Sequence, residues 1–492
     1  MKLLEPFDLG GMRLANRIVL PAMVTRLSGE DGFVNKDIIE RYVRFAKGEP
    51  GLIVLEAMAV HEAKSGPLLR IGHDRYLPGL TGLRRAVQEA GDVKVIPQII
   101  HFLKISRSGW RQKITDLSRE EIHAVTGHYA AAAGRARAAG FDGVELHMAH
   151  AYTLSSFLSR RNNRLDEYGR SLENRLRLPT ELIAAVRAEV SEEFPVGVRF
   201  DAEECIKDGY TVSDAARIAL RMARAGASYL SLSAGGKFED AIHKPGDPLY
   251  PYTGYSGDRC MPASNYPDGA NVYMAEAVKR HLTAHGCPTP VVATGKIRTP
   301  ELAERLLDSG VADLIGMARA LLADPDWPRK LREGRQDSII HCIYGNVCKN
   351  LDENFKKVRC VLWPKGALQA PESGDAEGPG WTLGREFLAT AEAGRVHLYW
   401  KQATDNEDVY GYEILRGEDG AGASHITTVK GCSYNDYDIE AGVRYTYWIQ
   451  AYDLAGNRSE KLGPRDVTLP YPDAARERLE RAAATRTEGR VP

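Results

Sequence analysis

The residues with the clearest potential for chemistry are two imidazoles and a phenol within six positions of one another, His147, His150 and Tyr152. All three side chains can exchange protons or take part in hydrogen bonds. They follow the segment 144–146, in which Val144 and Leu146 flank Glu145, and this segment predicts a strand. Residues 147 and 150 would point to opposite faces of a regular strand, so they can share one site only where the strand ends and the chain turns. We therefore expect a catalytic site at this strand end; a buried histidine beside surface polar residues is the alternative interpretation.

The elements that must position these residues are eight short apolar runs that alternate with helical patterns. The runs span residues 17–22, 52–59, 93–99, 143–147, 196–200, 229–233, 290–294 and 312–316. The helical patterns cover residues 37–47, 118–139, 173–190, 213–225, 275–285 and 300–309. Eight β/α repeats predict the α/β class and a closed (β/α)8 TIM barrel over residues 1–336. An open doubly wound sheet is the alternative.

Each predicted strand ends in residues with distinctive chemistry, and in a barrel such ends converge on one mouth. The ends are Pro21-Ala22-Met23, Glu56-Ala57, Gln98, His147, Arg199, Ser233-Ala234-Gly235-Gly236, Thr294-Gly295-Lys296 and Ala318-Arg319. We interpret them as parts of a single site. The connection 237–271 contains Tyr250, Tyr252 and Tyr255 and is too long for a plain linker, so we expect it to form a lid or wall over the mouth.

Composition narrows the class of protein. The chain has 492 residues, of which 43% are hydrophobic and 27% charged, as in ordinary soluble globular proteins. Its 65 Lys and Arg nearly balance its 66 Asp and Glu, so we expect no broad electropositive surface for nucleic acid or anionic lipid. There is no apolar run of membrane-spanning length and no signal-peptide pattern at the N-terminus. We expect a cytoplasmic protein, and a homo-oligomer is left open.

The pattern changes after the barrel. Residues 337–368 form a cysteine-containing extension, and residues 369–384 are rich in Gly, Pro and acidic residues, which predicts a linker. Alternating strand patterns then predict a small β-sandwich over residues 385–470. Its core should contain Trp400. The charged tail 471–492 has almost no apolar face, so we expect a frayed helix or disorder.

Five segments of the barrel half resemble the old yellow enzyme family of FMN-dependent NAD(P)H:flavin oxidoreductases. They are NRIVLPAM (16–23), PQIIH (97–101), FDGVELHMAHAYTLSSFLSRRNNRLDEYGRSLENR (141–175), VGVRFDAEE (196–204) and ADLIGMARALLADPDWP (312–328). The third and fifth segments are long and specific. The C-terminal sandwich resembles a fibronectin type III domain, through Trp400, YGYEILR and RYTYWIQAYDLAGNRSE.

The resemblance implies a role for each member of the motif at 147–152. His147 and His150 would bind the carbonyl oxygen of an electron-poor alkene, and Tyr152 would give a proton to its α-carbon. This agrees with physical expectation, because two N–H donors aimed at a developing enolate form an oxyanion hole worth about 10²–10³ in rate per donor. The implied reaction is reduction of an activated C=C bond.

The resemblance also implies an FMN site. Gln98 would bond the flavin pyrimidine edge, Arg199 would lie beside its N1–C2 carbonyl, and Gly295, Lys296, Ala318 and Arg319 would bind the phosphate. The further contacts expected are Ala22, Met23, Val24, Ala57 and His147. Strand capping is the alternative role for Gln98, and an ion pair inside the barrel is the alternative for Arg199.

Three features depart from the family pattern. Val24 stands where many relatives place a Cys, Thr or His against the flavin edge, and His-Phe-Leu-Lys at 101–104 replaces His-x-Gly-Arg. Cys342, Cys348 and Cys360 resemble the iron–sulfur motif of longer relatives, but Gly345 takes the place of the second ligand. A [4Fe–4S] cluster normally takes four thiolates. We therefore expect no cluster and no metal; buried thiols or a three-cysteine metal site are the alternatives.

The reductant and the reaction direction stay open at this point. No G-x-G-x-x-G motif follows a predicted strand, so NAD(P)H would have to reduce the flavin directly in the barrel mouth and then leave, which predicts ping-pong kinetics. One alternative is dehydrogenation or aromatisation of a cyclic or CoA-linked substrate, with electrons passed to a partner protein. A further alternative is a non-catalytic binding protein that docks to a partner through its sandwich.

Overall fold

The computed structural model describes residues 1–63, 66–104, 112–235, 257–372, 375–392 and 394–471. The chain divides into two compact units, Met1–Ala370 and Pro371–Pro492. The predicted lid residues Tyr250, Tyr252 and Tyr255 lie outside the described residues, as does almost all of the predicted tail. Among the described helices, none is long and apolar enough to cross a membrane.

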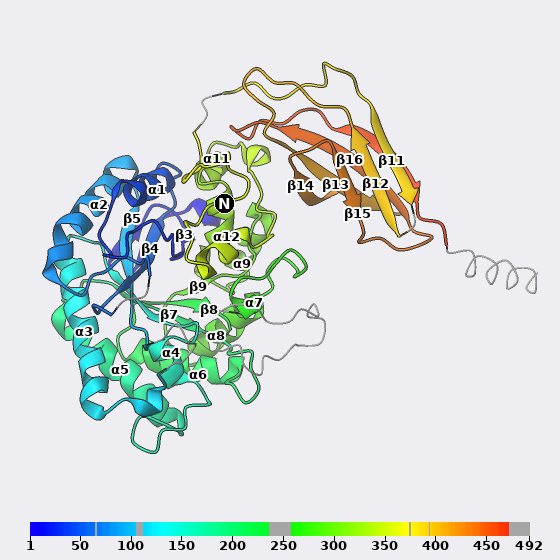
Figure 1. Ribbon diagram of the computed structural model, residues 1–492. Helices are drawn as coiled ribbons and strands as arrows, with labels where there is room; N and C mark the ends of the chain where they lie inside the picture. The colour runs from blue at the N-terminus through cyan, green and yellow to red at the C-terminus, as the bar shows by residue number, and fades with distance from the viewer. Residues whose placement is uncertain (64–65, 105–111, 236–256, 373–374, 393, 472–492) are drawn as a thin grey trace, which may run out of the picture. The chain divides into compact units, whose positions relative to one another are not determined.

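The first unit is a closed barrel of eight parallel strands (Figure 1). In barrel order these are β10 (Leu314–Gly316), β3 (Ile18–Leu20), β4 (Leu52–Ala59), β5 (Lys94–Ile100), β6 (Val144–Met148), β7 (Val196–Asp201), β8 (Tyr229–Ser233) and β9 (Val291–Ala293). The pairing of β10 with β3 closes the sheet, which confirms the predicted barrel and excludes the open sheet. The strands β3, β9 and β10 are shorter than predicted because only a few residues of each have ladder partners.

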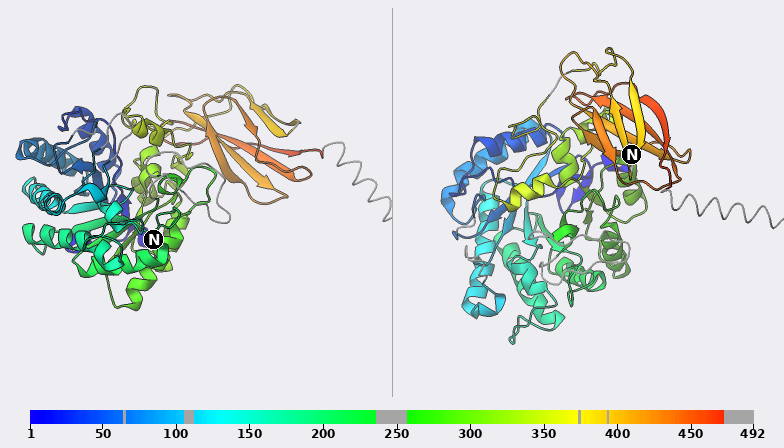
Figure 2. Two further views of the ribbon diagram at one scale, coloured as in Figure 1. Left: turned by 60° about the horizontal axis from the view of Figure 1, so that its bottom comes forward. Right: turned by 45° about the vertical axis from the view of Figure 1, so that its right-hand side comes forward.

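Helices surround the barrel (Figures 1 and 2). They are α1 (Lys36–Ala46), α2 (Leu77–Ala90), α3 (Arg119–Ala138), α4 (Thr153–Leu158), α5 (Leu172–Glu189), α6 (Val212–Arg224), α7 (Gly257–Cys260), α8 (Val272–Ala284), α9 (Pro300–Asp308), α10 (Ala318–Ala323), α11 (Trp327–Arg332) and α12 (Val347–Glu353). Short 3-10 turns are η1 (Lys2–Leu4), η2 (Asp74–Tyr76), η3 (Ile114–Asp116) and η4 (Gln336–Ser338). The long helix α3 begins with a capping box between Ser118 and Glu121, in which the side chain of each residue accepts the main-chain N–H of the other.

A hairpin closes the amino-terminal end of the barrel. Strands β1 (Phe7–Leu9) and β2 (Met12–Leu14) pair with each other and bury Leu9, Met12 and Leu14 against the barrel interior. The interior side chains in this cluster are Val19, Leu52, Val54, Ile96, Tyr229, Val292 and Leu314. The amino-terminal half of the barrel interior is therefore a packed apolar core, and the polar side chains lie in its carboxyl-terminal half.

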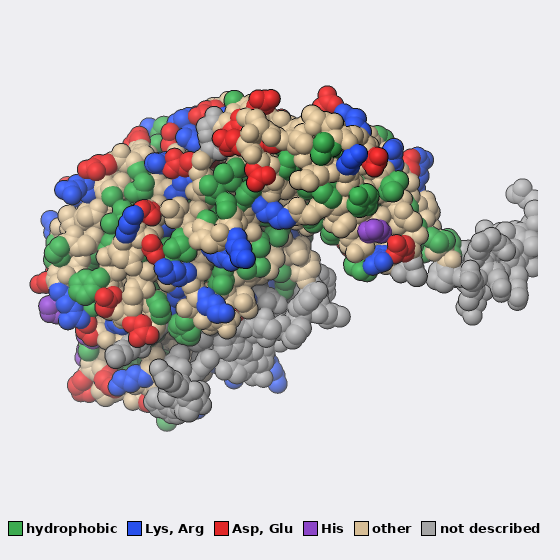
Figure 3. All heavy atoms as spheres, turned by 45° about the horizontal axis from the view of Figure 1, so that its top comes forward, with side chains coloured by type: hydrophobic (Ala, Val, Ile, Leu, Met, Phe, Trp, Pro, Cys, Tyr) green, Lys and Arg blue, Asp and Glu red, His purple; other side chains and the backbone are tan. Residues whose placement is uncertain are grey.

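The second unit contains two antiparallel sheets. One has the order β11 (Phe387–Glu392), β12 (Arg395–Trp400), β15 (Ser433–Asp436); the other has the order β14 (Ser424–Val429), β13 (Gly411–Glu418), β16 (Arg444–Tyr452), β17 (Leu462–Thr468). Trp400 is fully buried in the shared core, as predicted. The face of the molecule in Figure 3 mixes basic and acidic side chains, in keeping with the near-zero net charge.

Candidate active site

Strand alternation decides which side chains enter the carboxyl-terminal half of the barrel. On β5, the buried core residue Ile96 is followed two positions later by Gln98, which therefore faces inward as well. Cross-strand register pairs Gln98 with Glu145, His147 with Arg199, and Arg199 with Ser231. The polar strand-end residues of four neighbouring strands thus meet inside one barrel mouth.

A buried chain of hydrogen bonds fixes Gln98. Its amide Nε2 donates to Glu145 Oε1 (2.7 Å), and the hydroxyl of Tyr229 donates to Glu145 Oε2 (2.8 Å). Burial raises the pKa of Glu145, while Arg199 and these two hydrogen bonds oppose the rise. One amide N–H of Gln98 is held toward Glu145, which leaves its carbonyl oxygen as an acceptor and its second N–H as a donor in the barrel mouth.

The chain turns sharply at the end of β6. His150 and Ala151 both have a φ of +61°, a left-handed conformation that costs non-glycine residues about 1–3 kcal/mol each. Asp201 stabilises the turn, since its Oδ2 accepts the main-chain N–H of His150 (2.8 Å) and the hydroxyl of Ser155 (3.1 Å). The turn brings His150 Nδ1 to 3.2 Å from His147 Nε2.

The two imidazoles form a directed hydrogen-bond chain. The main-chain N–H of Ala149 donates to His147 Nδ1 (3.3 Å), which places the proton of His147 on Nε2. His147 then donates to His150 Nδ1, and His150 Nε2 donates to the Ser233 hydroxyl (2.6 Å). Burial lowers the pKa of His147 to about 3 and the pKa of His150 well below its ordinary range, with Arg199 adding to both shifts. Both rings are therefore neutral at physiological pH.

Arg199 provides the positive charge of this site. Its guanidinium donates to the hydroxyls of Ser231 (3.0 Å) and Ser233 (3.4 Å). A thiol joins the same group, because Cys260 hydrogen-bonds Ser233. Burial raises the pKa of Cys260, and Arg199 opposes that rise.

Tyr152 lies beside the imidazole of His147. Its ring meets the His147 ring edge-on with centroids 5.2 Å apart. It also packs against a small apolar cluster that contains Ala57, and Val24 packs against the same cluster. A β-bulge on β4 between Leu55 and Ala57 re-aims the strand at this point.

Two other predicted contacts, Ala22 and Met23, follow β3. Ala22 packs against the barrel interior, and Met23 lines a small internal cavity beside Tyr42 of α1. Val24 lines the same cavity and also packs with Tyr152 against the cluster that contains Ala57.

The predicted phosphate residues come from adjacent strands. Gly295 and Lys296 follow β9, while Ala318 and Arg319 open α10 after β10. Gly295 has a φ of +115°, and a Cβ there would come within 2.6 Å of the Cβ of Asn271. Only glycine fits this turn without strain.

The cations of these two loops converge on one ring. Arg319 stacks over Tyr344 at 4.6 Å, and Lys296 Nζ lies 5.1 Å from the same ring centroid. Arg319 also donates to Pro262 O (2.8 Å) and Asn346 Oδ1 (2.6 Å). Burial lowers the pKa of Lys296 to about 8. The cysteine-containing extension thus supplies the ring and the amide that contact the phosphate-loop cations.

The three cysteines of the extension are partly or fully buried. Burial raises the pKa of Cys342 to about 11 and also raises that of Cys348. Cys360 is buried near Arg41. Across the described ranges, these sulfur atoms do not form a group of three ligand atoms within 4.8 Å of one another.

Several residues of the site escape sequence analysis. Glu145, Asp201, Ser231 and Cys260 gain their contacts through cross-strand register or through α7, which no local pattern specifies. Glu145 had one available signal, because it lies two positions before His147 on the same strand and so shares its face.

The chain matches known proteins over its barrel. The sequence profile described as the NADH:flavin oxidoreductase / NADH oxidase family matches residues 103–247 and 261–338. NADH oxidase of Thermoanaerobacter brockii is 34% identical over 384 residues, covering 72% of this chain and 55% of that protein. NADPH dehydrogenase of Bacillus licheniformis is 32% identical over 349 residues, covering 67% of this chain and 93% of that protein. N,N-dimethylglycine/sarcosine dehydrogenase of Chromohalobacter salexigens is 29% identical over 381 residues, covering 73% of this chain and 52% of that protein.

Solved structures share the fold. A 2-naphthoyl-CoA reductase complex aligns with a TM-score of 0.65 at 22% identity, covering 77% of this chain and 60% of that one. An old yellow enzyme homologue from Zymomonas mobilis aligns with a TM-score of 0.54 at 22% identity, covering 68% of this chain and 93% of that one. The chain spans about half the length of the T. brockii and C. salexigens relatives. These matches confirm the resemblance drawn from the five barrel segments.

Proposed function

We propose, since the chain belongs to the NADH:flavin oxidoreductase / NADH oxidase family, that its barrel binds FMN and reduces an activated C=C bond with Tyr152 as proton donor. The observation that carries this proposal is the grouping of His147, His150 and Tyr152 beside Arg199 in one barrel mouth. NAD(P)H is the proposed reductant, and the proposed substrate is a small unsaturated carbonyl compound.

The described residues fit an FMN group. Gln98 offers its carbonyl oxygen to a ring N–H, since Glu145 orients its amide group, and Arg199 offers a cation to the electron-rich edge of a reduced ring. The Gly295 turn, Lys296 and Arg319 supply the backbone and cationic donors that suit a phosphate. When bound, FMN supplies hydride-transfer chemistry that no side chain can provide.

Neutral imidazoles are the form that the proposed carbonyl site requires. A neutral ring with its proton on Nε2 donates one N–H to an oxygen and does not hold a fixed positive charge. The Nε2 proton of His147 is given to His150 in this structure, and a substrate carbonyl oxygen would compete for it. Negative charge that develops on this oxygen is then stabilised by donors already in place.

Tyr152 has the chemistry of the proton donor. A phenol transfers its proton to a carbanion-like α-carbon when it is held within hydrogen-bond reach. The contact of its ring with His147, and its packing beside Val24 and Ala57, restrict its orientation toward the same mouth. Proton delivery and carbonyl binding would thus act on neighbouring atoms of one substrate.

The direct test is reconstitution. The purified protein should bind FMN and should reduce cyclohexenone or maleimide with NADH or NADPH, giving parallel lines in double-reciprocal plots because the nicotinamide leaves before the alkene enters. A protein that takes up no FMN, or that binds FMN but turns over neither alkene, would contradict the proposal.

A second candidate is oxidation of the substrate, with electrons passed to a partner protein. It is supported by the match to N,N-dimethylglycine/sarcosine dehydrogenase. Fast bleaching of the flavin absorbance by a saturated or amine substrate, beside slow bleaching by NAD(P)H, would favour this candidate over the first.

A further inference from the structure

We propose that the C-terminal unit contains a calcium site formed by Asp375, Asp405 and Asp453. Each residue offers a carboxylate oxygen, and the three oxygens lie within 4.8 Å of one another. Among the described residues this is the one group of three potential metal ligands. The site lies in the second unit and is independent of the flavin chemistry proposed for the barrel.

Three separate parts of the unit bring these carboxylates together. Asp375 precedes β11, Asp405 lies between β12 and β13, and Asp453 directly follows β16. Hydrogen bonds join the same parts: Asn457 Nδ2 donates to the main-chain oxygen of Asp375 (2.9 Å), and Asn406 Nδ2 donates to Asp375 Oδ1 (3.0 Å). The acidic cluster is therefore held by the fold and is not a chance meeting of mobile side chains.

The carboxylate of Asp405 points independently to a missing ligand. Each of its two oxygens exposes less than 1 Å², and neither accepts a hydrogen bond. Its neighbour Asp453 is 1% exposed and brings a second carboxylate oxygen within 4.8 Å. A desolvated carboxylate among like charges is unfavourable without a cation, because it has lost water and gained only repulsion.

The ligand chemistry favours Ca²⁺. All three ligands are carboxylate oxygens, which suit hard cations and not the thiophilic or imidazole-binding metals. Ca²⁺ binds oxygens at about 2.3–2.6 Å, so three oxygens within 4.8 Å of one another can surround it. Irregular loops also suit the flexible geometry of Ca²⁺, with water completing the coordination.

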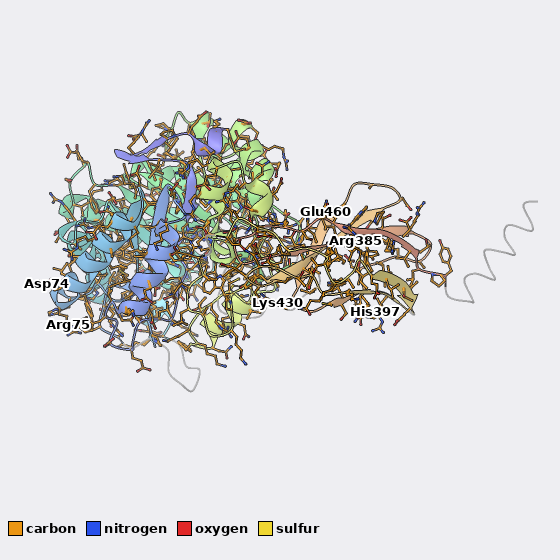
Figure 4. All side chains as sticks on the ribbon, turned by 90° about the horizontal axis from the view of Figure 1, so that it is seen from above. Asp74, Arg75, Arg385, His397, Lys430 and Glu460 are labelled. Carbon is orange, nitrogen blue, oxygen red and sulfur yellow. The ribbon has the colours of Figure 1, made fainter. Side chains whose placement is uncertain are left out.

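Calcium at this position would fasten the segment before β11 onto the sandwich. That segment already contacts the unit, since Gly380 pairs with Thr404 and Trp381 Nε1 donates to Glu460 O (2.8 Å). Arg385 also forms an ion pair with Glu460 (2.9 Å; both labelled in Figure 4). The ion would add a link from Asp375 to the two loops that carry Asp405 and Asp453.

The test uses the full-length protein treated with EDTA and dialysed. Calorimetric titration with CaCl₂ should show one bound ion per chain, and Ca²⁺ should raise the melting temperature of the second unit. Asp405→Asn should abolish both effects. The same substitution should raise the melting temperature in EDTA, because it removes an uncompensated buried charge. Asp408→Asn, an exposed carboxylate in the same loop, is the matched control and should behave as wild type.

Three results would overturn the proposal. They are the absence of binding heat at millimolar Ca²⁺, Ca²⁺ binding that survives in Asp405→Asn, and an equal response to MgCl₂. The melting temperature in EDTA distinguishes loss of the calcium site from misfolding. A misfolded Asp405→Asn variant would melt at a lower temperature than wild type both in EDTA and in Ca²⁺, whereas the proposal predicts a higher melting temperature in EDTA.

Discussion

At the scale of single residues, the site depends on buried groups that hold the reactive ones. Asp201 acts through the turn, because its carboxylate accepts the main-chain N–H of His150 at this strained position. Its Oδ1 lies 4.0 Å from His150 Nε2. We therefore interpret Asp201 as a positioning residue that keeps His150 within hydrogen-bond distance of His147.

Replacing Asp201 should separate its structural role from its charge. Asp201→Ala leaves two buried donors without an acceptor, so we expect a loss of about 2–4 kcal/mol in unfolding free energy and a loss of turnover. Asp201→Asn keeps one acceptor oxygen and should be clearly milder in both measurements. Chemical denaturation and alkene turnover check this ordering; equal effects of the two substitutions would contradict the acceptor role.

The neutral imidazoles predict a pH dependence of stability. The folded pKa of His147, about 3, is below its ordinary value of 6.5, so between these values the unfolded chain binds a proton that the folded chain does not. Stability should therefore fall as the pH is lowered through this window, by up to about 1.4 kcal/mol per pH unit for each such imidazole. His147→Asn should reduce the slope, measured by urea unfolding at several pH values.

The matched control for this slope is His397, which lies on β12 of the sandwich (Figure 4). Because 38% of this side chain is exposed, His397→Asn should change the slope less than His147→Asn does. An unchanged slope in His147→Asn would mean that His147 already carries a proton in the folded chain, against the proposed neutral form.

At the scale of elements, hydrophobic patterning was sufficient for the barrel but not for all of its helices. The runs at 52–59 and 229–233 match β4 and β8 at both ends, because both strands are buried along their whole length and are mostly apolar. Helix α2 escaped prediction because Pro78, Gly79 and Gly82 interrupt its pattern, although Leu80, Leu83 and Val87 form its buried stripe.

The candidate site was predictable only in part, for a related reason. The residues named from strand ends, such as Gln98 and Arg199, lie inside one mouth because parallel strands end on the same side of the barrel. Their partners Glu145 and Ser231 depend on the stagger between strands, and the bulge beside Glu56 depends on tertiary packing. Neither feature has a period that a single sequence displays.

The contact between β7 and β8 gives a test of how the barrel interior supports the site. A Cβ at Gly197 would come within 2.1 Å of the Tyr229 ring, whose hydroxyl bonds Glu145. Gly197→Ala should destabilise the protein by about 1–3 kcal/mol and weaken FMN binding through the displaced ring. Adding Tyr229→Leu should recover part of the stability but not the FMN affinity, as measured by denaturation and flavin fluorescence.

Tyr229→Phe is the control for this pair, since it keeps the ring and removes only the hydrogen bond to Glu145. It should be closer to wild type in stability than Gly197→Ala. If Gly197→Ala were as stable as wild type, the inference that Tyr229 leaves no room for a side chain at position 197 would be contradicted.

At the scale of the whole molecule, the two units have separate cores. The barrel core and the sandwich core share no residue, and the unit Met1–Ala370 contains every residue of the candidate active site. Removal of residues 371–492 should therefore leave FMN affinity and alkene turnover within about threefold of the full-length values, while it removes the calcium response. A truncated barrel that folds but binds no FMN would show that the sandwich contributes to the site.

In the proposed mechanism, Tyr152 delivers the proton, while Arg199, Gln98 and the phosphate loops bind the cofactor. The most direct measurement is rapid mixing of reduced, FMN-loaded protein with cyclohexenone, compared between wild type and Tyr152→Phe. We predict that the variant reoxidises with the alkene about 10²–10⁴ times more slowly, while its reduction by NAD(P)H keeps the wild-type rate. Reoxidation of Tyr152→Phe at the wild-type rate would show that Tyr152 is not the proton donor.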